Sequence, residues 1–89
     1  MNVYRLDPID AAHPSWKAST ELDSVWACAA TPGDARELTA RKTLRENVGP
    51  AEFDSPWRIP TVTSCLHQPS MKLMDPGTVV RADGSLVGD

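Results

Sequence analysis

The sequence predicts a small α+β domain in which one main helix packs on a mostly antiparallel sheet. Short β-forming stretches, one capped helical segment, and eight prolines and five glycines that confine the rest to turns and connections support this fold class. The expected order is strand, strand, helix, strand and C-terminal hairpin. A chain of 89 residues has room for one core, so residues 1–89 are expected to form a single domain.

Residues 2–9 are expected to form the first strand, with Tyr4 and Leu6 on the same face. Residues 10–24 have no clean hydrophobic period and contain several turn-forming side chains, which indicates a long loop or a short helical turn. Trp16 lies in this segment. Because a fully solvated indole is costly, the loop is expected to fold back and dock this ring on the domain.

Residues 25–30, VWACAA, predict the second strand. The stretch is apolar on both faces, which is typical of a strand inside a sheet and not at its edge. Trp26 is therefore expected to belong to the core. Strand order remains open, because the connection before this strand is too long for a tight hairpin.

The strongest local signal is the start of the helix. Thr31 can accept hydrogen bonds from first-turn amides, Pro32 suits the first helical position, and Asp34 stands where a capping-box carboxylate would reach back. The helix is predicted to run to about Val48, where Gly49 favours a left-handed stop.

The apolar positions of this helix do not form one stripe. The helix is therefore expected to curve, to end early near Lys42, or to bury two faces. Glu37–Arg41 and Lys42–Glu46 are spaced four residues apart, so their side chains can pair on an exposed side.

The second half of the chain is expected to be less regular. Residues 49–60 contain three prolines and predict an extended connection, whereas residues 61–67 alternate as a strand should. Residues 78–89 predict a terminal hairpin turning at Asp83-Gly84, the favoured two-residue turn. This hairpin is short, so its last strand is expected to fray.

Composition and charge narrow the function classes. The net charge of −3 gives no reason to expect affinity for nucleic-acid phosphates or anionic lipids. The chain shows no cationic-then-apolar leader and no apolar run long enough for a membrane span, so we expect a cytoplasmic protein without membrane contact. In that compartment Cys28 and Cys65 are expected to be reduced, small hydrophobic side chains.

Catalytic and metal chemistry find little support in the motifs. Cys65 and His67 could form a nucleophile pair, but side chains two residues apart on a strand lie roughly 7 Å from each other. Adding Cys28 and His13 gives four metal-binding side chains without the close pairs that zinc sites use. We therefore expect no catalytic residue, no metal and no cofactor, and keep a Cys/His enzyme as an alternative.

A second alternative is nucleic-acid binding through a basic helix face. Arg41, Lys42 and Arg45 share one helical stripe and could contact a phosphate backbone. Glu37 and Glu46 interrupt the patch, so an ordinary solvated helix face is the favoured interpretation.

The favoured function is a noncatalytic protein-binding or adaptor module. Trp57-Arg58 and Trp16 occupy proline-bearing loops, and aromatic and arginine side chains are the usual anchors of binding surfaces. These residues, or an exposed sheet edge, would contact a protein partner, either another protein or a second copy of the chain.

Three segments carry a resemblance: YRLDP at 4–8, VWACAATPGDAR at 25–36 and SPWRIPTVTSC at 55–65. Together they resemble small uncharacterised proteins of proteobacterial genomes. The resemblance implies a cytoplasmic bacterial protein and brings no activity, cofactor or site residue with it.

Overall fold

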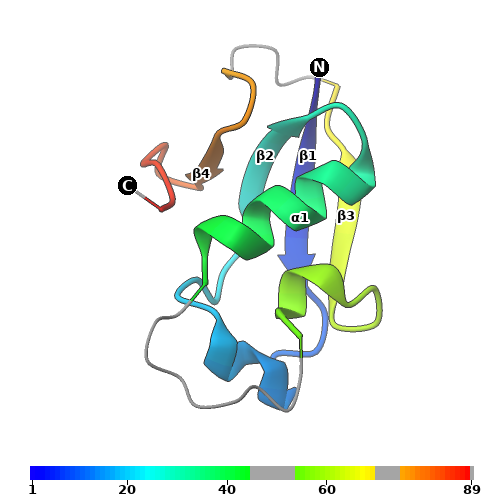
Figure 1. The fold of residues 1–89 in the computed structure, drawn as a ribbon, viewed down its shortest axis with the longest axis vertical. Helices are drawn as coiled ribbons and strands as arrows, with labels where there is room; N and C mark the ends of the chain where they lie inside the picture. Colours follow the sequence, from blue (N-terminus) through cyan, green and yellow to red (C-terminus); the bar gives the residue numbers. More distant parts are fainter. Residues whose placement is uncertain (45–53, 70–74, 89) are drawn as a thin grey trace.

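The computed structural model describes residues 1–44, 54–69 and 75–88. Within them an antiparallel sheet forms one layer, and a single α-helix crosses one of its faces (Figure 1). The predicted α+β class is confirmed. The elements are β1 (Asn2–Pro8), η1 (Pro14–Ala18), β2 (Val25–Ala29), α1 (Pro32–Lys42), η2 (Pro56–Arg58), β3 (Thr63–His67) and β4 (Val79–Arg81), where η denotes a short 3-10 helix.

The strand order is β3-β1-β2-β4, and every neighbouring pair is antiparallel. β2 lies inside the sheet, as its two apolar faces predicted. β1 is the other inner strand, and Leu6 stands opposite Val25 of β2 on one side and Cys65 of β3 on the other. The long connection from β1 to β2 carries η1 and lies at one end of the sheet (Figure 1).

The core lies between the sheet and α1. The helix contributes mainly small side chains, with Ala35 and Ala40 almost fully buried, so its backbone can lie close to the strands. Large side chains from the sheet and from the two 3-10 helices fill the remaining space. The buried cluster comprises Tyr4, Leu6, Trp16, Val25, Ala27, Ala29, Ala35, Ala40, Trp57, Val62, Val79 and Val87.

The helix begins as its sequence predicted and ends earlier than Val48. The Thr31 hydroxyl accepts a hydrogen bond from the Asp34 amide at 3.1 Å. After Lys42, Thr43 leaves helical geometry, and its carbonyl accepts from the Thr20 amide at 2.8 Å. This contact draws the chain toward the β1–β2 connection. The alternative in which the helix ends early, near Lys42, is therefore confirmed. The predicted continuation and the Lys42–Glu46 pair involve residues outside the described ranges.

The tryptophans differ in how they fit the places predicted for them. Trp26 is only half-buried and lies outside the core cluster, so its assignment to the core is wrong. Its strand neighbours Val25 and Ala27 face α1, and alternation along β2 therefore turns the indole to the opposite face. Trp57 and Trp16 are 0% and 8% exposed and belong to the core, which confirms the predicted docking of the Trp16 ring.

The terminal hairpin is present with a different turn. The Gly84 amide donates to the Arg81 carbonyl at 3.0 Å, and Gly84 has a left-handed φ of 87°. Gly84 therefore follows the two central residues of the turn, instead of being the second of a two-residue Asp83-Gly84 turn. The expected fraying is not seen up to Val87, which is buried and donates its amide to Val79 at 2.8 Å.

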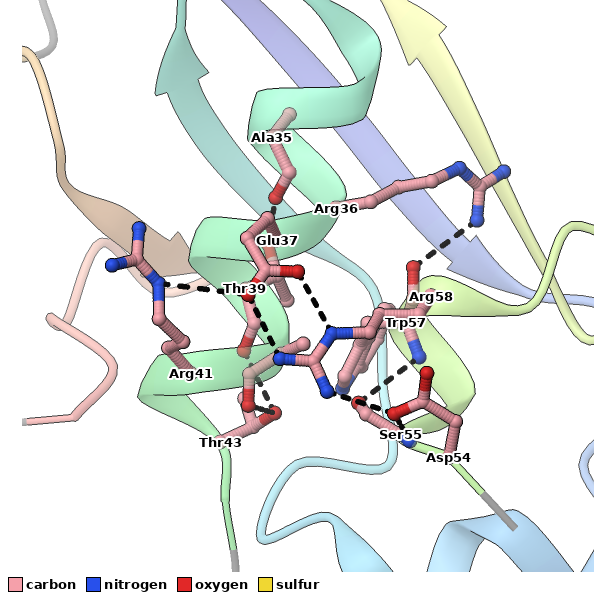
Figure 2. A network of polar contacts seen from close by, with 11 residues as sticks. Ala35, Arg36, Glu37, Thr39, Arg41, Thr43, Asp54, Ser55, Trp57 and Arg58 are labelled. Carbon is pink, nitrogen blue, oxygen red and sulfur yellow. Dashed lines mark hydrogen bonds and ion pairs between the residues drawn. The ribbon is translucent and has the colours of Figure 1, made fainter.

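Arg36 joins the helix to the second half of the chain. One terminal nitrogen, Nη1, donates to the Trp57 carbonyl at 3.2 Å and to the Thr63 hydroxyl at 2.9 Å, and Nη2 donates to the Thr63 carbonyl at 3.0 Å. Figure 2 shows this side chain reaching from α1 toward η2. The guanidinium thus replaces water for backbone groups of both η2 and β3.

Replacing Arg36 with alanine should lower the free energy of unfolding by about 2 kcal/mol, because hydrogen bonds from a charged donor contribute roughly 1.5–3 kcal/mol. Arg41→Ala is the matched control: Arg41 lies on the same helix, and its ion pair with Glu37 is 4.0 Å long. We expect that control to stay within about 0.5 kcal/mol of the parent chain. Urea unfolding measures both, and equal losses would show that Arg36 has no special role.

Candidate functional site

One row of side chains crosses the sheet on the face turned away from α1. Residues directly opposite each other on neighbouring strands share a face. Leu66 of β3 stands opposite Arg5 of β1, Arg5 opposite Trp26 of β2, and Trp26 opposite Val80 of β4. An isolated bridge adds Leu86 opposite Val80. We call these side chains the open-face row: Leu66, Arg5, Trp26, Val80 and Leu86.

The open-face row is largely apolar and accessible. Leu66 and Leu86 are 59% and 47% exposed, and Trp26 and Val80 are half-buried. Tryptophan, arginine and aliphatic side chains at the centre of an accessible surface are the usual composition of a protein-binding patch. No local pattern marked this row, because it forms only when the strand order and register are known.

Arg5 is fixed in the middle of the row. Its guanidinium carbon lies 5.4 Å from the centre of the Trp26 ring, within cation–π range. On its own strand, Nε donates to the Asp7 carboxylate at 2.9 Å. The charge is therefore held beside the Trp26 ring and the Asp7 carboxylate.

The accessible part of this face is limited. Val3 lies two residues before Arg5 on β1 and stands opposite Cys28 on the same face of the sheet. Both of these side chains are buried. The open-face row thus borders a covered region on one side. It borders polar side chains, among them Asp7 opposite Ser64, on the other.

Trp57 and Trp16 were candidates for partner contact, although Trp16 was also expected to dock on the domain, and the structure places both rings inside as clamps of their loops. The Trp57 ring lies edge-on to that of Trp16, with centroids 5.2 Å apart and planes at 86°. Its indole nitrogen donates to the Ser19 hydroxyl at 3.0 Å, and that of Trp16 donates to the Asp10 carbonyl at 2.7 Å. The 3-10 turns fold both loops inward, which proline-rich sequence alone does not reveal.

Arg58 lies at the surface in an ion-pair network that links η2 to α1 (Figure 2). Nε and Nη2 contact the two carboxylate oxygens of Glu37 at 2.8 and 2.9 Å, and Nη1 contacts Asp54 at 2.7 Å. These hydrogen bonds lower the pKa of Glu37 and of Asp54 and raise the pKa of Arg58. Arg58 is therefore engaged within the chain, and not presented as a free cation as expected.

The basic helix face is smaller than the sequence suggested. Arg41 is exposed and Lys42 is half-buried, while Arg45 lies outside the described residues. Glu37 is 4.0 Å from Arg41, and Arg36 is directed toward β3. Arg41 and Lys42 form what the described residues show of the predicted cluster, a modest surface for a phosphate backbone.

The Cys65 and His67 side chains occupy ordinary structural environments. The Cys65 sulfur is 3.8 Å from the Pro32 carbonyl, and burial raises the pKa of its thiol although nearby Arg36 acts in the other direction. A nucleophilic cysteine needs a lowered pKa. The His67 ring lies 5.6 Å from that of Tyr4.

Neither Cys28 nor Cys65 forms a disulfide bond. Among residues 1–44, 54–69 and 75–88, no three His, Cys, Asp or Glu side chains gather as a metal site. The arrangement offers contact surface and charge, and it provides no described cluster for metal coordination.

The Arg58 network should make stability depend on acid. Because the folded state holds the pKa values of Glu37 and Asp54 below their ordinary 4.5 and 3.8, the pairing stabilises the fold above those values and is lost as pH falls below them. Urea midpoints measured from neutral to strongly acidic pH should fall more steeply for the parent chain than for Arg58→Met. High salt should narrow the difference. Parallel curves for the two proteins would contradict this assignment.

The comparisons with known proteins leave the site to be interpreted from its own chemistry. No protein-family model matches the chain, and neither a curated protein nor a solved structure matches it. In the described part of the chain no helix has the length and apolar character needed to cross a bilayer.

Proposed function

We propose that this protein is a small noncatalytic protein-binding module whose contact surface is the open-face row. The observation that carries this proposal is the exposure of Leu66 and Leu86 on either side of Trp26, on the sheet face opposite the only α-helix of the described residues. A monomer gains nothing by keeping such a line of apolar side chains in water, whereas a partner would bury it.

The chemistry of the row defines the kind of partner. Sheet faces are flat, so the matching surface is a flat apolar one, such as another sheet at a spacing of about 10 Å. Asp7 pairs with Arg5 through Nε, and no described residue forms a hydrogen bond or ion pair with the two terminal nitrogens of that guanidinium. A carboxylate at the centre of the partner's apolar surface would pair with them in bidentate fashion.

The open-face row is smaller than the contact area of a stable protein–protein interface. A stable interface covers about 800 Å² on each partner, more than one row of side chains provides. The partner must therefore extend over the polar side chains that border the row. Fully burying a leucine or valine side chain contributes roughly 1.5–3 kcal/mol, so Leu66 and Leu86 would supply a substantial part of the binding free energy.

The environment of the thiol supports the noncatalytic part of the proposal. The pKa of Cys65 is raised by burial, so the thiol is less ionised at neutral pH than free cysteine. His67 neighbours Tyr4 and lies on the same strand face two residues away, where direct proton transfer from the thiol is out of reach.

A charged substitution on the row should weaken partner binding. We expect Leu86→Lys to weaken binding at least about tenfold, equivalent to about 1.4 kcal/mol, because an ammonium group would be buried against an apolar surface. Leu44→Lys is the matched control: Leu44 is 62% exposed and follows α1 on the other side of the sheet. Partners captured by the parent chain are identified, purified and titrated against all three proteins.

The control should bind within about twofold of the parent chain. Equal binding by Leu86→Lys and the parent chain would contradict the assignment of the surface. Equal weakening by both substitutions would contradict it as well, since it would indicate a nonspecific effect of added charge.

A further inference from the structure

The two edges of the sheet differ in how they are covered. Along the outer edge of β4 the chain returns and pairs with it, through Val87 to Val79 at 2.8 Å and Arg81 to Ser85 at 2.9 Å. Along the outer edge of β3 no described strand follows, and Figure 1 shows β3 as the last strand on that side. Among the residues that the structure describes, one edge of the sheet is therefore protected and the other is open.

Two hydrogen bonds fix which backbone groups of β3 point outward. The Ile9 amide donates to the Val62 carbonyl, and the Gln68 amide donates to the Val3 carbonyl, both at 2.8 Å. Because N–H and C=O directions alternate along an antiparallel strand, Ser64 and Leu66 also direct these groups toward β1. The backbone groups of residues 63, 65 and 67 then point away from the sheet.

Thr63 is already satisfied within the chain. Its amide donates to the Ile59 carbonyl at 3.1 Å, and its carbonyl accepts from Arg36 at 3.0 Å. Within the described residues, the outward amide and carbonyl groups of Cys65 and His67 have no such partner. The open edge of β3 thus offers the outward amide and carbonyl groups of two residues, Cys65 and His67, for hydrogen bonding.

We propose that two copies of this chain pair β3 against β3, antiparallel, about a two-fold axis at Leu66. Cys65 of each copy then stands opposite His67 of the other, and their outward amides and carbonyls bond to each other. The two open-face rows become one surface of twice the width, so the inference rests on the proposed function and enlarges the surface offered to its partner.

The register follows from what the neighbouring residues can offer. An axis at Cys65 would place His67 opposite Thr63, whose amide is already used. An axis at His67 would place Cys65 opposite Pro69, which has no amide hydrogen. The axis at Leu66 is the nearby choice that satisfies both open residues in both copies.

The side chains of β3 suit such pairing. Leu66 would face its own symmetry mate in a non-hydrogen-bonded pair, with Cα atoms about 4.5 Å apart. Its side chain is 59% exposed, so the pairing buries apolar surface that each copy leaves in water. Edge strands usually resist pairing through lysine, proline or an inward charge, and TSCLH contains none of these.

Light scattering on a dilution series of the full chain tests the proposal. The parent chain should form a concentration-dependent dimer, and Leu66→Lys should be a monomer, because two ammonium groups would face each other at the axis. Leu86→Lys should remain dimeric, since Leu86 lies beyond the opposite edge of the sheet. A parent chain that is monomeric throughout overturns the proposal, as does a dimer that Leu66→Lys leaves intact or that Leu86→Lys dissolves.

Cysteine cross-linking tests the register independently of that variant's folding. In a Cys65→Ser background, Leu66→Cys should oxidise to a covalent dimer, because facing Cα atoms at the axis are within disulfide range. Ser64→Cys, two residues along the same face, should stay uncross-linked. Cross-linking through position 64, or its absence at position 66, overturns the proposed axis. Light scattering and cross-linking need no other protein. They can therefore fail or succeed independently of the Leu86→Lys titration, which tests the proposed function.

Discussion

The burial of Trp57 is the contact on which the rest of the structure depends. Its ring packs edge-on against Trp16, its indole nitrogen bonds to Ser19, and its carbonyl accepts from Arg36. The two indoles bring about 150–250 Å² each into a core whose helix supplies mainly alanine and threonine. They also hold η1 and η2 together at one end of the sheet. Burial of the two rings offsets the conformational entropy that is lost when these long connections become ordered.

A consequence of this arrangement is that the sheet is covered on one face by α1, while part of the other face remains accessible. With Trp16 and Trp57 enclosed, the indole left near the surface is Trp26, held under Arg5 in the open-face row. Binding capacity in this account belongs to the sheet, through one face and the edge of β3, and not to the proline-bearing loops. Leu66 lies on both surfaces, which connects the two proposals.

The sequence predicted correctly those features that depend on residues close together in the chain. The cap at Thr31 and the alternation of β3 depend on neighbours within a few residues, and both were predicted correctly. The side of β2 on which the helix packs depends on distant pairing, so Trp26 was placed wrongly. Arg36 bonds Thr63, 27 residues away, and no local pattern in the sequence predicts that contact. The open-face row needs the strand order, which no local pattern supplies.

Hydrogen exchange of the three indole N–H groups, followed by NMR, tests the central claim most directly, with Trp26→Phe assigning one signal. The indole protons of Trp57 and Trp16 should exchange only when the domain opens, because each is enclosed and donates within the chain. The signal lost in Trp26→Phe should be the fast one. If the Trp57 proton exchanged as rapidly as that of Trp26, the loops would not be held by a buried indole pair, and the account would be contradicted.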